Sequence, residues 1–350
     1  MKKVFPFLSI VFLLVITGGC SGIKFLTVET HEPAQVTLPA DVLSLVVVNN
    51  VVQQPDNVGH NNRPIGRSQP DRVEASSDSV AIFYTEALAQ FLDEEEYFYL
   101  VFYYNEPLRS DTHFFQEQPL LPETMNRIRE ETGADAVISL DKLIMQTDKR
   151  DHFRQQGYTY SDLTGKIGST LRVYMPTMEG KIPAVHYEDS LRWEGFNIRD
   201  DRVYSEAMIP SREEAMKLLA IRAAEKMTHV FTPHWVTQER WYYTSGNSLM
   251  REGSALAKRA EWPEAIAKWE TYYRARSNKI DKAKAASNIA FAHEMMGDME
   301  GAYTWVVIAN DLFTEQTGAH SLESRRSLIY KNELNRRRGN SNQINMQNDH

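Results

Sequence analysis

Short hydrophobic runs and one helical pattern alternate along the first third of the chain. Residues 42–48 (Val-Leu-Ser-Leu-Val-Val-Val) are mostly β-branched and are apolar at both alternating positions, which predicts a strand buried on both faces. Between residues 80 and 92, apolar side chains recur three and four positions apart, which predicts a helix with one face toward a core. Residues 97–104 are rich in aromatic side chains and predict a second strand.

The pattern of strand and helix continues through the next segment. Pro122 is expected to open a second helix, and Gly133 lies where a glycine commonly ends one. Residues 134–145 are apolar and predict a third strand, whereas residues 146–166 are polar and are expected to form a long excursion from the sheet.

Two further strands and a helix complete the first domain. Residues 169–175 and 183–193 predict an antiparallel pair. Ser211 and Glu214 have the spacing of a capping box, which begins a helix. This order of elements predicts a mixed-sheet α/β sandwich domain over residues 41–235, with helices on at least one face.

One of these strands carries a family resemblance. Residues 131–140 read Glu-Thr-Gly-Ala-Asp-Ala-Val-Ile-Ser-Leu. This segment resembles a strand of envelope lipoproteins whose domain is of the curli-assembly or penicillin-binding-protein-activator type. In those proteins an opening strand, a helix, an aromatic strand and a second helix precede it in the same order. The resemblance covers about residues 40–232 and implies the same α/β topology for this chain.

The last third of the chain has a different, repeated pattern. Gly253 and Ala265 recur 37 positions later as Ala290 and Ala302, and each pair lies in a segment of helical period. The spacing of small residues resembles that of the tetratricopeptide repeat, a helix–turn–helix unit of 34 residues. We therefore expect an all-α tetratricopeptide-like helical hairpin domain over residues 246–335, so that the fold class of the whole chain is α+β.

The repeats require support from other parts of the chain. Two repeats are fewer than the three usually needed for a stable array. A capping helix is therefore expected at residues 321–335, and residues 336–350 are expected to form a polar, disordered tail.

The beginning of the chain predicts export and lipidation. Lys2 and Lys3 precede an apolar run over residues 4–16, which at 1.5 Å per residue reaches about 20 Å and is too short to span a bilayer. Small residues then lead to Cys20, and the segment resembles a bacterial lipobox except that Thr17 stands where Leu is usual. The resemblance implies a signal peptide at residues 1–19 and a lipidated Cys20. The alternative is an ordinary signal peptide with an incidental cysteine.

The segment after the lipidated cysteine bears on the location of the chain. Residues 20–40 contain Pro33 and Pro39 and have no clean period, so they are expected to form a tether. In some Gram-negative bacteria, an acidic run just after the lipidated cysteine resembles a signal for export to the cell surface. Residues 21–24 contain no such run. This absence favours the periplasmic face, and the expected location is the cell envelope, with the lipid anchor in the outer membrane and the protein facing the periplasm.

Composition excludes several classes of function. The 350 residues include 39 basic and 47 acidic side chains, a net charge of −8, which gives no support for a nucleic-acid-binding protein. The single cysteine excludes a disulfide framework and a cysteine-built metal site. No phosphate-binding loop, nucleophile elbow or zinc-protease motif is present, and His229 and His234 have a spacing unsuited to one metal-binding face. We therefore expect no cofactor, no metal and no enzymatic activity.

The repeats supply the functional hypothesis. The order of lipobox, α/β domain and helical repeats resembles that of uncharacterised tetratricopeptide-repeat lipoproteins of Bacteroides-type bacteria, a family with no assigned activity. The repeat resemblance implies a concave groove lined by the first helix of each hairpin, with Lys258, Lys284, Asn288 and Phe291 available to a partner. In some members of the repeat family, an asparagine at the position of Asn288 grips an extended peptide backbone. These residues could instead be solvated, or the groove could be filled by the capping helix of the chain itself.

Three functions follow from these expectations. The first is a membrane-anchored envelope lipoprotein that acts as a non-enzymatic protein-binding, scaffolding or assembly factor, whose partners are envelope proteins or peptides. The second is an enzyme acting on cell-wall or glycan material, with residues 49–75 and 146–166 as lids. The third is a glycan-binding lipoprotein.

Overall fold

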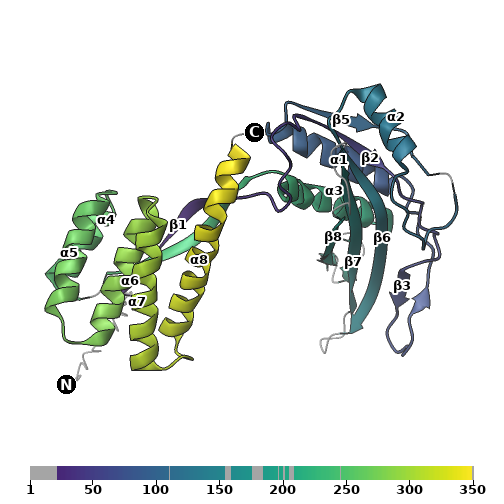
Figure 1. Cartoon of the computed structure of the whole chain (residues 1–350). Coiled ribbons are helices and arrows are strands. Elements are labelled where there is room, and N and C mark those ends of the chain that lie inside the picture. The colour runs from purple at the N-terminus through teal and green to yellow at the C-terminus, as the bar shows by residue number, and fades with distance from the viewer. Residues whose placement is uncertain are drawn as a thin grey trace, which may run out of the picture. The chain divides into compact units, whose positions relative to one another are not determined.

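The computed structural model describes residues 22–348, with the exception of 110, 154–158, 176–183, 196, 200–201, 205–208 and 245. The chain divides into two compact units (Figure 1). The helical unit comprises the described residues up to Thr30 together with Trp235–Ser341, and the α/β unit comprises His31–His234 and the described residues from Asn342 onward.

The α/β unit is built on a seven-stranded mixed sheet. The strands are β2 (Ser44–Asn49), β3 (His60–Arg63), β4 (Asp71–Arg72), β5 (Leu100–Tyr104), β6 (Ala136–Phe153), β7 (Thr159–Tyr174) and β8 (Ala184–Gly195). Strand β2 lies between β5 and β6 and is parallel to both, while β7 pairs antiparallel with β6 and β8. A separate short hairpin joins β9 (Asn197–Arg199) and β10 (Arg202–Tyr204).

Helices cover both faces of the sheet around β2. Helices α1 (Val80–Glu94) and α3 (Arg212–Phe231) share a core with Leu45 and Val47, whereas α2 (Pro122–Thr132) lies over the opposite face with Val46 and Val48. All four of these β2 side chains are fully buried, because a strand between two helical layers has no solvent face. The predicted α/β sandwich is therefore confirmed.

Two local predictions for the helices of this unit are confirmed. The backbone of Gly133 is left-handed, with φ of 73°, and ends α2. The hydroxyl of Ser211 accepts a hydrogen bond from the backbone N–H of Glu214, as expected of a capping box.

The expected excursion at residues 146–166 is wrong. Strands β6 and β7 form one long hairpin, paired from Val137 with Tyr174 to Phe153 with Thr159. Leu143, Met145 and Thr147 are buried, whereas Ile144 and Gln146 between them are exposed, because only one face of this part of the sheet is covered. Because the uncovered face of this strand carries polar residues, its alternation of buried and exposed positions was not recognised in the sequence.

The expected tether at residues 20–40 is also wrong for its described part. Strand β1 (Ile23–Glu32) pairs with β11 (His234–Tyr243) in a two-stranded sheet. Thr30 and Glu32 on β1 are buried despite their polarity. The segment is therefore an element of the folded structure.

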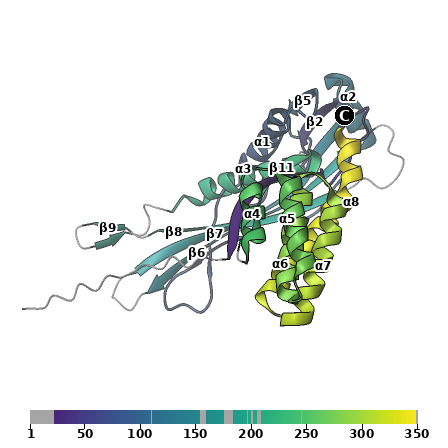
Figure 2. The same cartoon turned by 90° about the vertical axis from the view of Figure 1, so that its left-hand side faces the viewer.

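The helical unit contains the predicted hairpins. Its helices are α4 (Ser248–Ala257), α5 (Trp262–Ala275), α6 (Lys279–Met295), α7 (Met299–Thr317) and the first part of α8 (Leu322–Asn348). Helices α4 and α5 form one hairpin and α6 and α7 the next, and the hairpins lie side by side (Figure 2). The fold class of a mixed-sheet domain followed by an all-helical domain is confirmed.

Small residues lie where the paired helices approach each other. Ala265, Ala290 and Ala302 are fully buried. A Cβ atom added to Gly253 would lie 2.4 Å from Nε1 of Trp269, so this crossing of α4 and α5 requires glycine. The expected close approach at these positions is confirmed.

The expected disorder of residues 336–350 is wrong for its described part, since α8 continues to Asn348. The part of α8 from Asn342 onward belongs to the α/β unit, where the side-chain amide of Gln347 donates to the carbonyl of Ala34 and accepts from the N–H of the same residue. A polar composition does not prevent a helix whose side chains find such partners. Among the described residues, no helix has the length and apolarity needed to cross a bilayer.

Candidate functional site

Two of the predicted groove residues are buried in the interior of the helical unit. Asn288 and Phe291 are both 0% exposed, so the expectation that they face an open groove is wrong. The ring of Phe291 stacks on Tyr242, with centroids 6.0 Å apart, and meets the edge of Trp262 at 5.5 Å. The groove side of the hairpins is therefore covered by strand β11, which carries Tyr242.

Asn288 holds this strand by its backbone. Its side-chain carbonyl oxygen accepts a hydrogen bond from the N–H of Tyr243 at 2.6 Å, and its amide nitrogen donates to the carbonyl of the same residue at 2.8 Å. One amide side chain thus satisfies both main-chain groups of an extended residue, as a neighbouring strand would. Asn288 grips an extended backbone, as the repeat resemblance implied, but the backbone belongs to the same chain.

The two predicted lysines lie apart from each other. Lys258 is exposed where α4 ends, whereas the half-buried Lys284 lies in the second turn of α6, with its ammonium 5.9 Å from the ring centroid of Tyr243. The structure therefore brings Lys284, Asn288 and Tyr243 together and leaves Lys258 outside this group.

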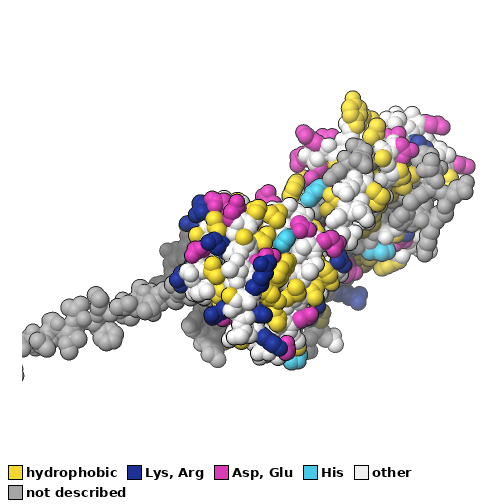
Figure 3. All heavy atoms as spheres, turned by 60° about the vertical axis from the view of Figure 1, so that its left-hand side comes forward, with side chains coloured by type: hydrophobic (Ala, Val, Ile, Leu, Met, Phe, Trp, Pro, Cys, Tyr) yellow, Lys and Arg dark blue, Asp and Glu magenta, His cyan; other side chains and the backbone are white. Residues whose placement is uncertain are grey.

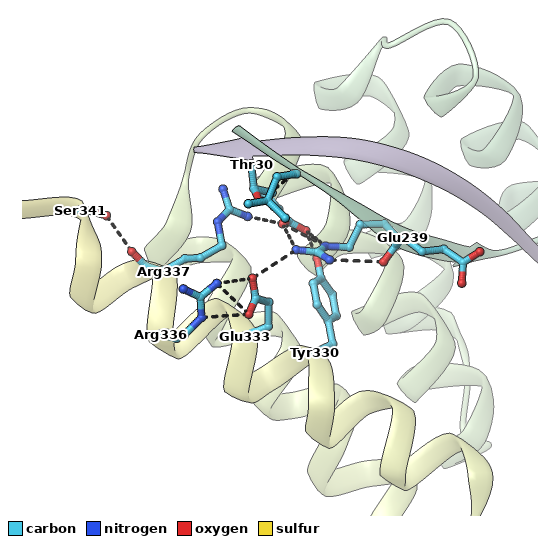
Figure 4. A network of polar contacts seen from close by, with 10 residues as sticks. Thr30, Glu239, Tyr330, Glu333, Arg336, Arg337 and Ser341 are labelled. Atoms are coloured by element: carbon cyan, nitrogen blue, oxygen red, sulfur yellow. Dashed lines mark hydrogen bonds and ion pairs between the residues drawn. The ribbon is translucent and has the colours of Figure 1, made fainter. Parts of the chain in front are cut away.

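A buried ionic network fastens β11 to the helices (Figure 4). Glu294 on α6 accepts hydrogen bonds from Nε and Nη2 of Arg240 at 3.0 and 2.9 Å and from the hydroxyl of Tyr330 at 2.5 Å. Arg337 on α8 donates to the same carboxylate. Because Glu294 and Arg240 are almost fully buried, their charges have little water to solvate them and depend on these partners.

The pKa values in this network reflect the same burial. Burial raises the pKa of the Tyr330 hydroxyl well above its usual range, and the nearby carboxylate of Glu294 raises it further. Burial disfavours the charged form of Arg240, but its bonds to Glu294 outweigh this effect and raise the pKa of the guanidinium. Sequence reasoning missed this network, since Arg240 and Glu294 lie far apart in the chain.

The α/β unit has a crevice of about 260 Å³ at the carboxyl ends of its parallel strands. The walls come from the segment after β2, the start of α1 and the loop after β5 that contains Arg109. Ligands of open α/β sheets commonly bind at this position, where neighbouring connections leave toward opposite faces. The guanidinium of Arg109 is already paired with Asp111, at 2.8 Å, and the described lining contains no carboxylate, histidine or cysteine.

Strand β5 forms an edge of the sheet and consists of aliphatic and aromatic residues. It reads Leu-Val-Phe-Tyr-Tyr, and within the described residues its single strand partner is β2. At its beginning, Tyr99 and Leu100 are 87% and 41% exposed. An unprotected apolar edge offers main-chain donors and acceptors to another strand.

The other edges of the sheet carry protective features. Strand β4 has two residues, both charged, and β8 exposes the charged side chains of Glu188, Arg192 and Glu194. Short and charged edges of this kind discourage pairing with other chains. The contrast makes β5 the candidate surface for a partner strand.

The remaining sequence expectations concern Cys20 and the histidines. Cys20 lies outside the described residues. The rings of His229 and His234 are stacked, with centroids 4.1 Å apart, and burial lowers the pKa of His229. Within the described part of the chain, no group of three or more His, Cys, Asp or Glu side chains is arranged to hold a metal ion.

Comparisons with known proteins match two successive segments of the chain to two families. Residues 42–243, more than half of the chain, match the family described as domain of unknown function DUF8603, and the chain belongs to this family. Residues 251–336 match a second family, described as domain of unknown function DUF6340. No curated protein matches the chain.

The boundary between the two families differs from the boundary between the structural units. The first family segment ends at Tyr243, so it includes β11, and the second includes Asn288. Strand β11 of the first segment is therefore held by a helix of the second. The two family segments are joined by a shared hydrophobic core as well as by the chain.

Proposed function

We propose that this chain is a lipid-anchored envelope protein that acts by binding another protein, without catalysis, and that the partner adds an extended segment to the edge of strand β5. The anchor is the diacylglycerol thioether expected at Cys20, and the location is the outer membrane with the protein facing the periplasm. The observation that carries the binding role is the unprotected apolar edge of β5, in a sheet whose other edges are short or charged.

The filled groove directs the proposal to the α/β unit. Because β11 occupies the position where a peptide would lie in the repeats, an external peptide would have to displace the buried Tyr242 and Tyr243. Burial of two such aromatic side chains contributes several kcal/mol, which makes displacement costly. Within the described residues β5 has a strand partner on one side only, so addition of a strand to its other side breaks no pairing of the sheet.

The chemistry of the partner follows from the edge. Main-chain hydrogen bonds supply affinity in strand addition, and side chains at alternate positions supply specificity. The exposed Tyr99 and Leu100 favour a segment with apolar side chains at alternate positions. The acidic residues 93–96 just before this edge favour a basic residue at the neighbouring end of that segment.

Crosslinking in intact cells tests this function. The double substitution Tyr99→Lys and Leu100→Lys places charge on the edge without disturbing the core, because both side chains are exposed. We expect the variant to lose crosslinked partners that the unmodified chain captures, at an unchanged melting temperature. A matched control is Phe153→Lys with Leu218→Lys, two exposed apolar residues elsewhere in the α/β unit, which should retain those partners. Equal capture by the edge variant and the control would contradict the proposal.

A further inference from the structure

The start of the described chain is held against the helical unit. The N–H of Thr244 donates to the carbonyl of Gly22 at 2.9 Å, and strand β1 begins at the next residue. Two residues of extended chain span at most about 7 Å. An anchor at Cys20 would therefore hold this end of the helical unit within a short distance of the bilayer surface, because Ser21 alone separates Cys20 from Gly22.

The same end of the unit contains the loop between α5 and α6. A Cβ atom added to Gly246, just after Thr244, would lie 3.3 Å from the hydroxyl of Tyr272 in the last turn of α5. Helix α6 begins at Lys279, close behind the end of α5 (Figure 1). The residues at the end of α5 and the start of α6 are therefore neighbours of the anchored segment.

This end of the unit is basic although the chain as a whole is acidic. Residues 274–284 contain five basic side chains and one acidic side chain, against a net charge of −8 for the whole chain. Three of the five are in ion pairs, namely Arg274 with Glu270, Arg276 with Asp281, and Lys279 with Glu315. Elsewhere on the visible face of the helical unit, basic and acidic side chains are interspersed (Figure 3).

Four further cations at this end have no carboxylate partner within the described residues. Lys282 and Lys284 lie over the rings of Tyr273 and Tyr243, at 5.1 and 5.9 Å. The ammonium of Lys24 lies 5.8 Å from the ring of Tyr242, and Arg251 donates to the carbonyl of Gly246 at 3.0 Å. We call Lys24, Arg251, Lys282 and Lys284 the basic end. Contact with aromatic rings and carbonyls leaves their charge available to an external anion.

We infer that the basic end docks on the anionic phospholipid headgroups of the membrane that carries the lipid anchor, an inference that rests on the proposed lipidation of Cys20. Basic residues near a lipid anchor add an electrostatic attraction to anionic headgroups, and each Lys or Arg close to an anionic surface strengthens binding about fivefold. The helical unit then acts as a platform against the bilayer.

Sedimentation with lipid vesicles tests the inference on the chain without its lipid. Residues 21–350 are mixed with vesicles of phosphatidylglycerol, which is anionic, or of phosphatidylcholine, which is neutral overall. We expect binding to phosphatidylglycerol alone, and the loss of that binding in high salt, because screening shortens the range of the interaction to a few ångström. The double variant Lys282→Glu and Lys284→Glu should lower the binding by at least about tenfold.

A matched control reverses charge at the other end of the same unit. Lys258→Glu with Arg259→Glu changes two exposed cations where α4 ends, and it should leave binding to phosphatidylglycerol unchanged. Equal binding to the two lipids, or an equal loss in the two double variants, would overturn the inference. The double variant at Lys282 and Lys284 could lose its helical circular dichroism signal. In that case the variant Lys24→Glu, at the exposed start of β1, is tested instead, and it should lower binding to phosphatidylglycerol about tenfold or more.

The thiol of Cys20 allows the anchored state itself to be measured. Cys20 is the single cysteine of the chain, so the chain from residue 20 can be coupled to a maleimide lipid at the expected anchor position. We expect acetylation of Lys282 and Lys284 by a water-soluble reagent to be several-fold slower on phosphatidylglycerol vesicles than on phosphatidylcholine vesicles. Equal rates would overturn the inference and leave the lipid anchor itself standing, whereas absence of lipid on Cys20 in cells would overturn both.

Discussion

Asn288 binds Tyr243 through both of its main-chain groups, and this pair closes the groove of the helical hairpins. Asn288 is fully buried on α6 and Tyr243 lies at the end of β11. The contact therefore turns a surface that resembles a peptide-binding groove into an interior. It also joins the DUF8603 segment, which ends at Tyr243, to the helices of the DUF6340 segment.

The first prediction concerns this pair. Asn288→Ala leaves the buried N–H of Tyr243 without this partner and leaves its carbonyl with the longer 3.4 Å bond from the Ser254 hydroxyl, and each buried main-chain group left unsatisfied costs about 1–3 kcal/mol. We expect urea unfolding to show a loss of about 2–4 kcal/mol. The control is Asn332→Ala on the exposed side of α8, which should change the free energy of unfolding by less than about 0.5 kcal/mol. Similar values for the two variants would contradict the described role of Asn288.

The second prediction concerns the buried carboxylate of Glu294. Glu294→Gln removes the negative charge that compensates Arg240 and Arg337, and an uncompensated buried charge costs about 3–5 kcal/mol. Glu300→Gln is the matched control, because the ion pair of Glu300 with Arg338 is exposed and contributes about 0–1 kcal/mol. Thermal unfolding of both variants checks the difference, and a small effect of Glu294→Gln would mean that the network contributes little.

The sequence predicted the elements whose pattern is local. Strand β2 was predictable because a strand buried on both faces is apolar at most positions, and the close helix approach at Gly253 because small residues recur with the spacing of the tetratricopeptide repeat. The filled groove was not predictable, since an asparagine that grips a foreign peptide and one that grips its own chain have the same sequence pattern. The edge of β5 was also hidden, because strand order depends on pairings between residues far apart in sequence.

The third prediction concerns acid sensitivity of the α/β unit. Burial and the stacked His234 lower the pKa of His229, so the folded state disfavours the protonated ring. Lys226 lowers the pKa further, while Glu225 raises it, and Glu95 lies 3.9 Å from Nδ1. A base whose pKa is lower in the folded state destabilises the fold as the pH falls below the unfolded value of about 6.5.

Unfolding at two pH values checks this sign. We expect the free energy of unfolding to fall between about pH 7.5 and about pH 5.5, and to fall less in His229→Gln, which cannot take up the proton. His320→Gln, in an exposed position before α8, is the control and should keep the pH dependence of the unmodified chain. An equal pH dependence in all three proteins would show that His229 does not cause the acid sensitivity.

The fourth prediction uses two glycines in helices. An alanine in place of glycine usually stabilises a helix by up to about 1 kcal/mol. At Gly253 the new Cβ would lie 2.4 Å from Nε1 of the buried Trp269, so Gly253→Ala should instead destabilise by about 1–3 kcal/mol as overpacking. Gly339→Ala on α8 meets no described atom within 4 Å and should stabilise. We expect thermal unfolding to show a loss of stability in Gly253→Ala and a gain in Gly339→Ala. A change of the same sign in both variants would mean that the described crossing of α4 and α5 is wrong.

The last prediction concerns the anchor, on which the proposed function depends. Cys20→Ala removes the sulfur that would form the thioether, so the variant should carry no labelled palmitate and should leave the membrane fraction when cells are broken in high salt. High salt is needed because the basic end is expected to keep some unlipidated chain on anionic membranes, and this attraction is screened by salt. Ser21→Ala is the matched control and should remain labelled and membrane-bound. Labelled palmitate on the Cys20→Ala variant would contradict the lipoprotein assignment. An unlabelled variant that leaves the membrane would support an anchor at Cys20, two residues before Gly22, whose carbonyl accepts a hydrogen bond from Thr244.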